Sequence, residues 1–273
     1  MLSCTKVDLV RGQEPLDDRF PFLEFETLLD LGHQVPGLRG RLAETVMSWR
    51  TWWHGLRLAQ PRSWLGYRDT VHLLEAADQR RFIKSHLPFS LLPPALLHQG
   101  KVVYVARNAR DAMVSSYHHH RLIKGHDYVG DLPTFAKRFM KDQLMLGSFF
   151  NHLEEAWKVK EYPNILFIWF EDMKKDLRSV IKKVCNFLDC SLTKEEMERL
   201  LNHLDFKNFK NNPAVNREDA KDFGFMRKDG NFVRKGTVGS WKEEFKDHPE
   251  MEAEFNSWLD TKIDQSNVIF PVK

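Results

Sequence analysis

Residues 234–245, with the sequence RKGTVGSWKEEF, combine the residue types that bind a phosphate group. Arg234 offers a planar fork of N–H donors suited to a phosphate, and Lys235 adds a compact positive charge. Gly236 and Gly239 can adopt backbone conformations that turn several amide N–H groups toward one anion. A basic surface turn would be the simpler interpretation if this segment stood alone.

A second segment with phosphate-binding chemistry is KVVYVARNARDAMVSSY, residues 101–117. Its apolar residues 102–105 predict a buried strand that ends near Arg107, and Asn108 or Asp111 can cap the helix that follows. Ligands of open α/β sheets gather at the carboxyl ends of strands, where helix N-termini attract phosphate. Arg107 and Ser115 are therefore candidate phosphate ligands, although an arginine there could simply pair with a neighbouring carboxylate.

Together these segments resemble the cofactor signatures of the cytosolic sulfotransferases. RKGTVGSWKEEF is similar to the C-terminal signature of that family and KVVYVARNARDAMVSSY to its 3′-phosphate segment. Further matches are RFIKSHLP at 81–88 and FIWFEDM at 167–173, whereas PFLEF at 21–25 and LPFSLLPP at 87–94 resemble arthropod members. The resemblance runs from about residue 19 to 273, diverges over 29–79, and implies a single domain over 1–273.

The fold and chemistry implied by the resemblance are specific. The family has a doubly wound parallel α/β sheet flanked by helices, related to the P-loop NTPases. Its members transfer a sulfuryl group from 3′-phosphoadenosine-5′-phosphosulfate (PAPS) to a hydroxyl or amine of a small, fairly apolar acceptor. This chemistry requires no metal and implies a cytoplasmic protein.

Family positions carry over to several residues of this chain. Five of them match the 3′-phosphate pocket: Arg107, Ser115, Arg234, Lys235 and Gly236. Phe206 aligns with an aromatic residue that packs on adenine, and Phe170 stands where many members have tyrosine. Ser240 replaces an aspartate that is common in the glycine motif.

His86 is the candidate catalytic base. Histidine can remove a proton from an acceptor hydroxyl near neutral pH. Lys84 lies two residues earlier on an extended segment, so its side chain would point to the same side and could stabilise negative charge on the transferring group. By resemblance, both residues occupy the family's KTHLP positions, which read KSHLP here.

One family segment is not found in these 273 residues. Nothing resembles the TYPKSGTTW phosphate loop that follows the family's first strand, and no GxxxxGK[ST] motif occurs. We therefore expect the first strand and the phosphate loop to be missing, with half of the cofactor site. The alternative to a sulfotransferase is a catalytically impaired nucleotide- or ligand-binding relative, from a truncated isoform or an incomplete gene model.

Composition favours a small-molecule enzyme over other classes. The net charge of +3 argues against a nucleic-acid partner, which we rank last among the functions, and no apolar run is long enough to span a membrane. Three cysteines without a CxxC pair suit a reducing compartment.

Consecutive His118, His119 and His120 would point about 100° apart on a helix, so we expect no shared metal. Only Lys242 matches the family's dimer segment, so a homodimer is not assumed.

The elements that must position these residues follow the alternation of an α/β fold. Residues 165–170 predict a second buried parallel strand. Helices are expected over 111–124, 132–146, 147–158 and from 171 to 188, and over 193–204 behind a capping box of Thr193 and Glu196. The polar stretch 211–230 reads as a long mobile loop over the site. Tryptophans 49, 52, 53 and 64 suggest an amphipathic helix covering the acceptor pocket.

Overall fold

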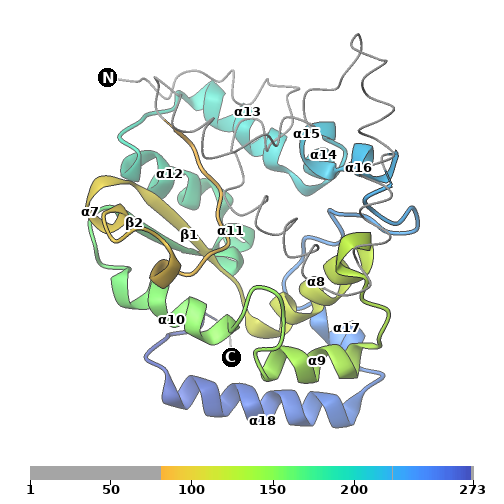
Figure 1. Cartoon of the computed structure of the whole chain (residues 1–273). Helices are drawn as coiled ribbons and strands as arrows, with labels where there is room; N and C mark the ends of the chain where they lie inside the picture. The colour runs from red at the N-terminus through yellow and green to blue at the C-terminus, as the bar shows by residue number, and fades with distance from the viewer. Residues whose placement is uncertain (1–80, 223, 272–273) are drawn as a thin grey trace, which may run out of the picture. The chain divides into compact units, whose positions relative to one another are not determined.

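The structure is a computed structural model that describes residues 81–222 and 224–271 (Figure 1). The chain divides into two compact units. The described part of the first unit comprises residues 87–212 and 216–271 apart from 223, and that of the second comprises 81–86 and 213–215. The residues that carry the phosphate-binding chemistry all belong to the first unit. The predicted tryptophan-rich helix, the PFLEF segment and any strand before residue 81 lie outside the described residues.

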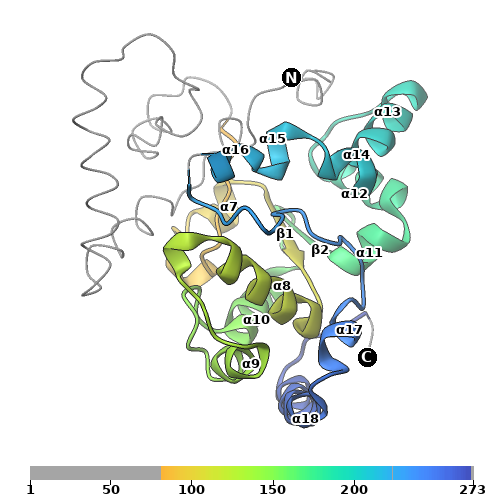
Figure 2. The same cartoon turned by 90° about the vertical axis from the view of Figure 1, so that its right-hand side faces the viewer.

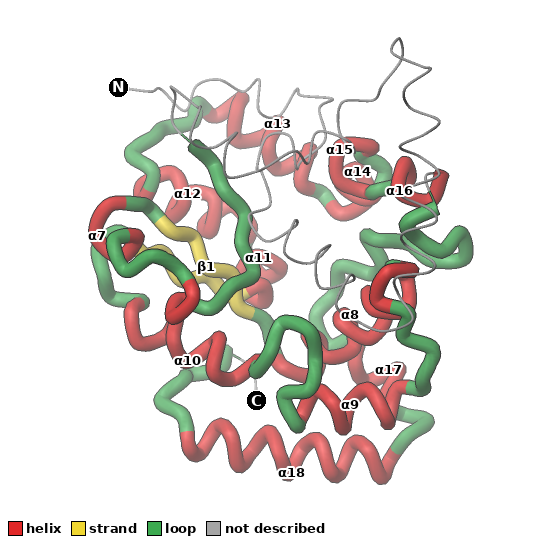
Figure 3. Tube along the Cα trace, in the orientation of Figure 1, coloured by secondary structure: helices red, strands yellow, loops and turns green. Residues whose placement is uncertain are grey.

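The sheet in the described part of the first unit is a parallel pair of strands (Figure 3). β1 (Val102–Ala106) pairs with β2 (Ile165–Trp169), and the register runs from Val102 opposite Ile165 to Ala106 opposite Trp169. Both segments are rich in β-branched and aromatic residues, which favour a pleated, half-buried surface. The predicted parallel α/β arrangement is confirmed, with β2 ending one residue before the expected limit. The prediction that residues 102–105 are buried is wrong, because Val103 is 39% and Val105 is 52% exposed.

Three helices connect β1 to β2, and each begins at a side-chain cap. They are α8 (Ala109–Leu122), α9 (Leu132–Met140) and α10 (Phe149–Val159). Asn108 accepts a hydrogen bond from the Arg110 amide at the start of α8, and Asp131 and Ser148 act likewise for α9 and α10. Such caps satisfy backbone donors that have no partner within the helix.

Helix α9 is shorter than the apolar pattern over 132–146 predicts. It ends at Met140, and Asp142 adopts a left-handed conformation with φ of 57°. The turn lets Leu144 fold back against the core, where it is partly buried. Packing of one apolar side chain therefore overrides the continued helical pattern.

The helices after β2 complete a layered arrangement. They are α11 (Phe170–Lys175), α12 (Leu177–Phe187) and α13 (Lys194–Leu204). The predicted capping box is present at α13, where Thr193 and Glu196 each accept a hydrogen bond from the other's backbone amide. In both views the sheet lies between α10 and α12, so helices cover both of its faces (Figures 1 and 2). This is the doubly wound pattern expected from the sequence.

The C-terminal part of the chain contains short helices and one long one. They are α14 (Phe206–Lys210), α15 (Pro213–Asn216), α16 (Glu218–Asp222), α17 (Trp241–Phe245) and α18 (Pro249–Gln265). The expected loop over 211–230 thus contains two short helices. Short helical segments η1 (Phe89–Leu91), α7 (Leu96–Gln99) and η2 (Lys124–His126) complete the described elements.

The main core lies among α8, α9, α10, α17 and α18. Its fully buried aromatic side chains are Phe135, Phe150, Phe245 and Phe255. α17 contacts both α8 and α18, so this core fixes the glycine segment that precedes α17 against the start of α8. Across residues 81–222 and 224–271, no helix is both long and apolar enough to cross a membrane.

Candidate functional site: the carboxyl ends of the two strands

Arg107 and Phe170 form the first contact of the site. They are the residues directly after β1 and β2, whose last paired residues are Ala106 and Trp169. The Arg107 guanidinium carbon lies 4.5 Å from the centre of the Phe170 ring, a distance typical of a cation–π interaction. The parallel register therefore places a cation on an aromatic ring at the sheet edge where α/β folds bind ligands.

Arg107 also reaches the glycine segment, 130 residues further along the chain. Its Nη2 donates a hydrogen bond of 3.1 Å to the Thr237 carbonyl oxygen. Its Nε is buried and has no hydrogen-bond partner among the described residues. Burial lowers the pKa of Arg107, as does the nearby charge of Arg234, while Asp111 and Glu171 oppose this. The guanidinium remains charged, so a half-buried cation has an unused donor at the strand end.

The glycine segment is held by a buried carboxylate, Asp111, which is 1% exposed. Asp111 Oδ2 accepts a hydrogen bond of 2.7 Å from the Gly239 amide, and Oδ1 accepts bonds of 3.1 Å from the Ser240 hydroxyl and the Trp241 amide. Asn108, not Asp111, caps α8. Asp111 thus fixes the position of the glycine segment relative to β1.

Gly236 packs directly against Phe206. Gly236 has φ of +61°, and a Cβ built on it would lie 2.2 Å from Phe206 Cε2. A side chain at this position is therefore excluded both by conformation and by space. The Phe206 ring also lies 5.8 Å from the ammonium nitrogen of Lys174 on α11. This contact brings the predicted adenine-stacking residue to the glycine segment.

Arg234 and Lys235 are paired with carboxylates of α17. Arg234 Nη1 lies 3.2 Å from Glu244 Oε1, and Lys235 forms an ion pair with Glu243. The Lys235 ammonium lowers the pKa of the Glu243 carboxyl through its hydrogen bond and its charge. The Arg234 charge also acts on Arg107, so the two arginines lie within electrostatic reach of each other. An anion between them would be attracted by both.

Ser115 lies in the second turn of α8 and is half-buried. Within the described part of the chain, no hydrogen bond joins it to Arg107 or Arg234. Lys84 and His86 belong to the second compact unit, and their roles in chemistry stay predictions. The structure therefore brings together Arg107, Phe170, Phe206 and the glycine segment, and the role of Ser115 as a phosphate ligand stays a prediction.

Three carboxylates of the site had no functional interpretation from the sequence. Asp111 and Glu244 hold the glycine segment and Arg234. Glu171 is 6% exposed and its Oε1 accepts a 2.9 Å hydrogen bond from the Asn108 amide, which ties the two strand ends together. The only available signal was their place inside the segments that resemble the family, since their partners are distant in sequence.

These features fit a phosphorylated adenine nucleotide. The unused Arg107 donor, the neighbouring Arg234 charge and the side-chain-free Gly236 suit a phosphate group approaching the backbone. Phe170 and Phe206 offer aromatic faces for a base. The described residues include no group of three or more His, Cys, Asp or Glu side chains that could hold a metal ion. His118 contacts Glu244 and His120 contacts the Ser116 carbonyl oxygen, while the rings of His119 and His120 both pack against His126.

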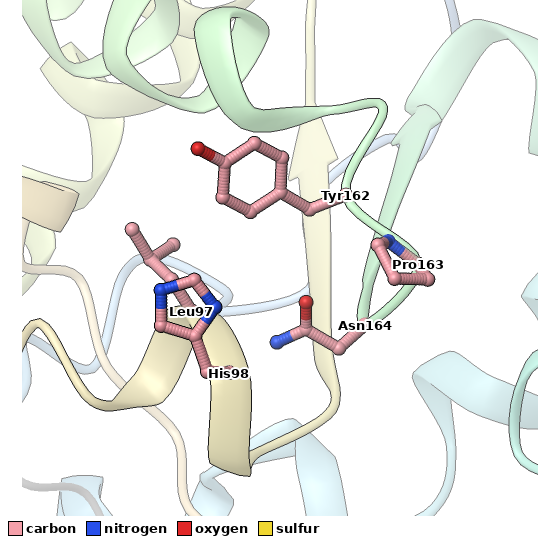
Figure 4. Close-up of a pocket in the computed structure, with 5 residues that line it drawn as sticks. All are labelled: Leu97, His98, Tyr162, Pro163 and Asn164. Atoms are coloured by element: carbon pink, nitrogen blue, oxygen red, sulfur yellow. The ribbon is translucent and has the colours of Figure 1, made fainter.

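A separate hollow lies at the opposite, amino ends of the strands (Figure 4). Leu97 and His98 of α7 face Tyr162 across it, and the His98 and Tyr162 rings stack with centres 6.2 Å apart. Asn164 donates to the Leu96 and Gly100 carbonyl oxygens. These contacts join the α7 region to the turn before β2 and include none of the predicted site residues.

Comparisons with known proteins agree with this geometry. The luciferin sulfotransferase of Photinus pyralis is 33% identical over 270 residues, covering 96% of this chain and 66% of that protein. Sulfotransferase 1A1 of Mus musculus is 39% identical over 181 residues, covering 66% of this chain and 62% of that protein. The chain thus spans about two thirds or less of the length of these relatives.

Solved structures and a family profile point the same way. A retinol dehydratase crystallised with retinol and PAP has a TM-score of 0.78 and 30% identity, covering 97% of this chain and 76% of that one. A second structure of retinol dehydratase, in complex with androsterone and inactive cofactor PAP, has a TM-score of 0.79 and 29% identity. It covers 98% of this chain and 76% of that one. The family described as "Sulfotransferase domain" matches residues 5–267. With its strand-end arginine and glycine segment in place, the chain belongs to the sulfotransferase domain family.

Proposed function

We propose that the protein transfers a sulfuryl group from PAPS to a hydroxyl or amine of a small, fairly apolar acceptor. The observation that carries this proposal is the convergence of Arg107, Thr237 and Gly236 with Phe206 at the strand ends. Solved relatives with bound PAP support a nucleotide of this class. We also propose that residues 1–273 form one sulfotransferase domain that acts in the cytoplasm.

The nucleotide would be held by its 3′-phosphate and its base. Arg107 and Arg234 supply charge to the 3′-phosphate, with Lys235, Ser115 and the Gly236 amide as further donors. Phe206 and Phe170 stack on the adenine. Because Phe170 has no hydroxyl, its contact with the base is limited to the ring face.

The chain's contribution to chemistry rests on two residues before α7. When bound, PAPS supplies an activated sulfuryl group whose bond to the bridging phosphate oxygen breaks as the acceptor oxygen bonds to sulfur. His86 accepts the acceptor's proton, and Lys84 offsets the negative charge that develops on the transferring group. The products are the sulfated acceptor and adenosine 3′,5′-bisphosphate (PAP), so the reaction needs no further reactant.

An assay with labelled sulfuryl donor tests the proposal. The chain is incubated with labelled PAPS and a panel of phenols, steroids and retinol, beside the same chain with a family phosphate-loop segment added at its N-terminus. We expect transfer by the extended chain to fall by about 10²-fold or more in His86→Ala, because the general base is lost. His203→Ala, on α13, is the matched control and should retain transfer.

The same assay separates this function from the alternative of an impaired nucleotide-binding relative. Very low transfer by the unextended chain with transfer restored by the added loop supports a sulfotransferase site that depends on that loop. No transfer by either chain, despite PAP binding, would support the impaired relative. Transfer that is unaffected by His86→Ala would remove His86 from the mechanism.

A further inference from the structure

A basic, partly open cavity lies outside the strand-end site, between the end of α8 and the segment before Arg234. It has a volume of about 440 Å³. Its lining residues are His118, Arg121, Leu122, Tyr128, Val129, Arg227, Asp229, Gly230, Asn231 and Arg234. Neither Arg107 nor Ser115 is among them, so only Arg234 is shared with the predicted 3′-phosphate site.

An antiparallel bridge between Ile123 and Met226 builds this cavity. Its two hydrogen bonds, each of 2.9 Å, run from the Arg227 amide to the Leu122 carbonyl oxygen and from the Lys124 amide to the Phe225 carbonyl oxygen. Gly230 then approaches so closely that a Cβ there would lie 2.8 Å from Leu122 Cδ1. The segment carrying Arg227 is thereby fixed beside the last turn of α8.

The charged lining of the cavity has an excess of cations. Arg121, Arg227 and Arg234 face a single lining carboxylate, Asp229. Glu244 lies behind Arg234 and is already shared between Arg234 and His118. The arginines cannot lose their charge, so the lining attracts a small anion.

Two further contacts show how the cations are held. Arg121 Nη1 donates a 2.7 Å hydrogen bond to the Tyr117 hydroxyl, which fixes its guanidinium along α8. Burial lowers the pKa of His118, the hydrogen bond to Glu244 and its charge oppose this, and the charges of Arg234 and Arg121 lower the pKa further. A neutral His118 donates from Nε2 to Glu244, so its Nδ1 can only accept a hydrogen bond, and the ring adds no charge to the lining.

The cavity also has an apolar side. Leu122, Tyr128 and Val129 contribute aliphatic and aromatic surface next to the arginines. Such a combination suits an organic molecule with an apolar body and one oxyanion group rather than a bare ion. We propose that this cavity is a second anion-binding site, which takes a small organic phosphate, sulfate or carboxylate beside the nucleotide site.

Calorimetry with phenyl phosphate and inorganic phosphate tests this proposal on the full chain. Phenyl phosphate should bind more tightly than inorganic phosphate because its ring covers the apolar side. Arg121→Ala and Arg227→Ala should each weaken phenyl phosphate binding by about tenfold or more, the effect of losing a charge-assisted hydrogen bond. Arg199→Ala, an exposed arginine on α13, is the matched control and should leave binding unchanged.

Addition of PAP separates the two sites. Phenyl phosphate should still bind at saturating PAP, and PAP affinity should be the same in Arg121→Ala as in the unmodified chain. Displacement of phenyl phosphate by PAP would show that the cavity is only the outer end of the nucleotide site and would overturn the proposal. Equal phenyl phosphate affinity in all three arginine variants would overturn it as well. Failure of PAP itself to bind would count against the proposed function and not against this cavity.

Discussion

The Asp111 carboxylate accepts a 2.7 Å hydrogen bond from the backbone amide of Gly239, a residue 128 positions away in the chain. The carboxylate is buried and receives two further donors, from Ser240 and Trp241. Hydrogen bonds to an ionised acceptor in a buried site are stronger than neutral ones. This one carboxylate therefore fixes the glycine segment to the helix that begins at the end of β1.

We expect Asp111→Asn to weaken both the fold and nucleotide binding. The amide keeps the shape of the side chain but presents N–H groups where one carboxylate oxygen accepted a bond, so a buried donor loses its partner. Loss of such a bond costs on the order of 1.5–3 kcal/mol. Urea denaturation measures the free energy of unfolding, and Asp264→Asn on the exposed side of α18 is the control.

Comparing the affinities for two nucleotides shows whether Asp111 positions the glycine segment or only stabilises the fold. If Asp111 positions the glycine segment, Asp111→Asn should lower affinity for PAP more than affinity for 5′-AMP, which has no 3′-phosphate. A uniform loss for both nucleotides would mean that Asp111 only supports the fold.

Two glycines of the same segment provide a matched pair. Gly236 and Gly239 both have positive φ, 61° and 77°, so alanine at either position carries a backbone cost of roughly 1–2 kcal/mol. Only at Gly236 would the new Cβ also collide with Phe206, while nothing lies within 4 Å of the corresponding position at Gly239. Gly236→Ala should therefore reduce PAP affinity, measured by calorimetry, well beyond Gly239→Ala. Similar losses in both would mean that Phe206 and Gly236 do not act together.

Acid should destabilise the protein through two half-buried histidines, His120 and His126. Burial and the nearby His120 lower the pKa of His126 to about 4, and burial also lowers the pKa of His120. Their rings lie 4.7 Å apart. In the unfolded chain these histidines take up protons near pH 6.5, whereas in the folded chain they do not. Their contribution to the free energy of unfolding is therefore complete above that pH and is lost as the pH falls toward about 4. The slope from His126 approaches about 1.4 kcal/mol per pH unit, and His120 contributes in the same direction.

Urea denaturation between pH 5 and 7.5 measures this dependence. His126→Gln should flatten the acid slope, and His203→Gln should preserve it. An unchanged slope in His126→Gln would assign the acid sensitivity to other groups.

Structural features that depend on residues close together in the chain could be predicted from the sequence. The strand-end position of Arg107, the parallel strands and the Thr193 capping box follow from local patterns and are confirmed. The role of Asp111 could not be predicted, because its three donors come from a segment more than a hundred residues away. Asn108 and Asp111 were equal candidates for the cap of α8, and only the tertiary structure decides between them.

The limits of helices were predictable only where a cap marks them. Helix α9 begins at the expected Asp131 cap but ends early, because Asp142 turns left-handed and lets Leu144 pack inward. The polar composition of 211–230 suggested a loop, yet two short helices form there. Tertiary packing decides both outcomes.

Calorimetric titration with PAP of the unmodified chain and of Arg234→Ala tests the central claim most directly, namely that segments distant in sequence form one 3′-phosphate site. Loss of the charge-assisted contact should weaken PAP binding by about ten- to a hundredfold, equivalent to roughly 1.5–3 kcal/mol, and should leave the weaker binding of 5′-AMP unchanged. Arg199→Ala controls for the loss of a positive charge. Equal PAP affinity in the unmodified chain and in Arg234→Ala would contradict the account.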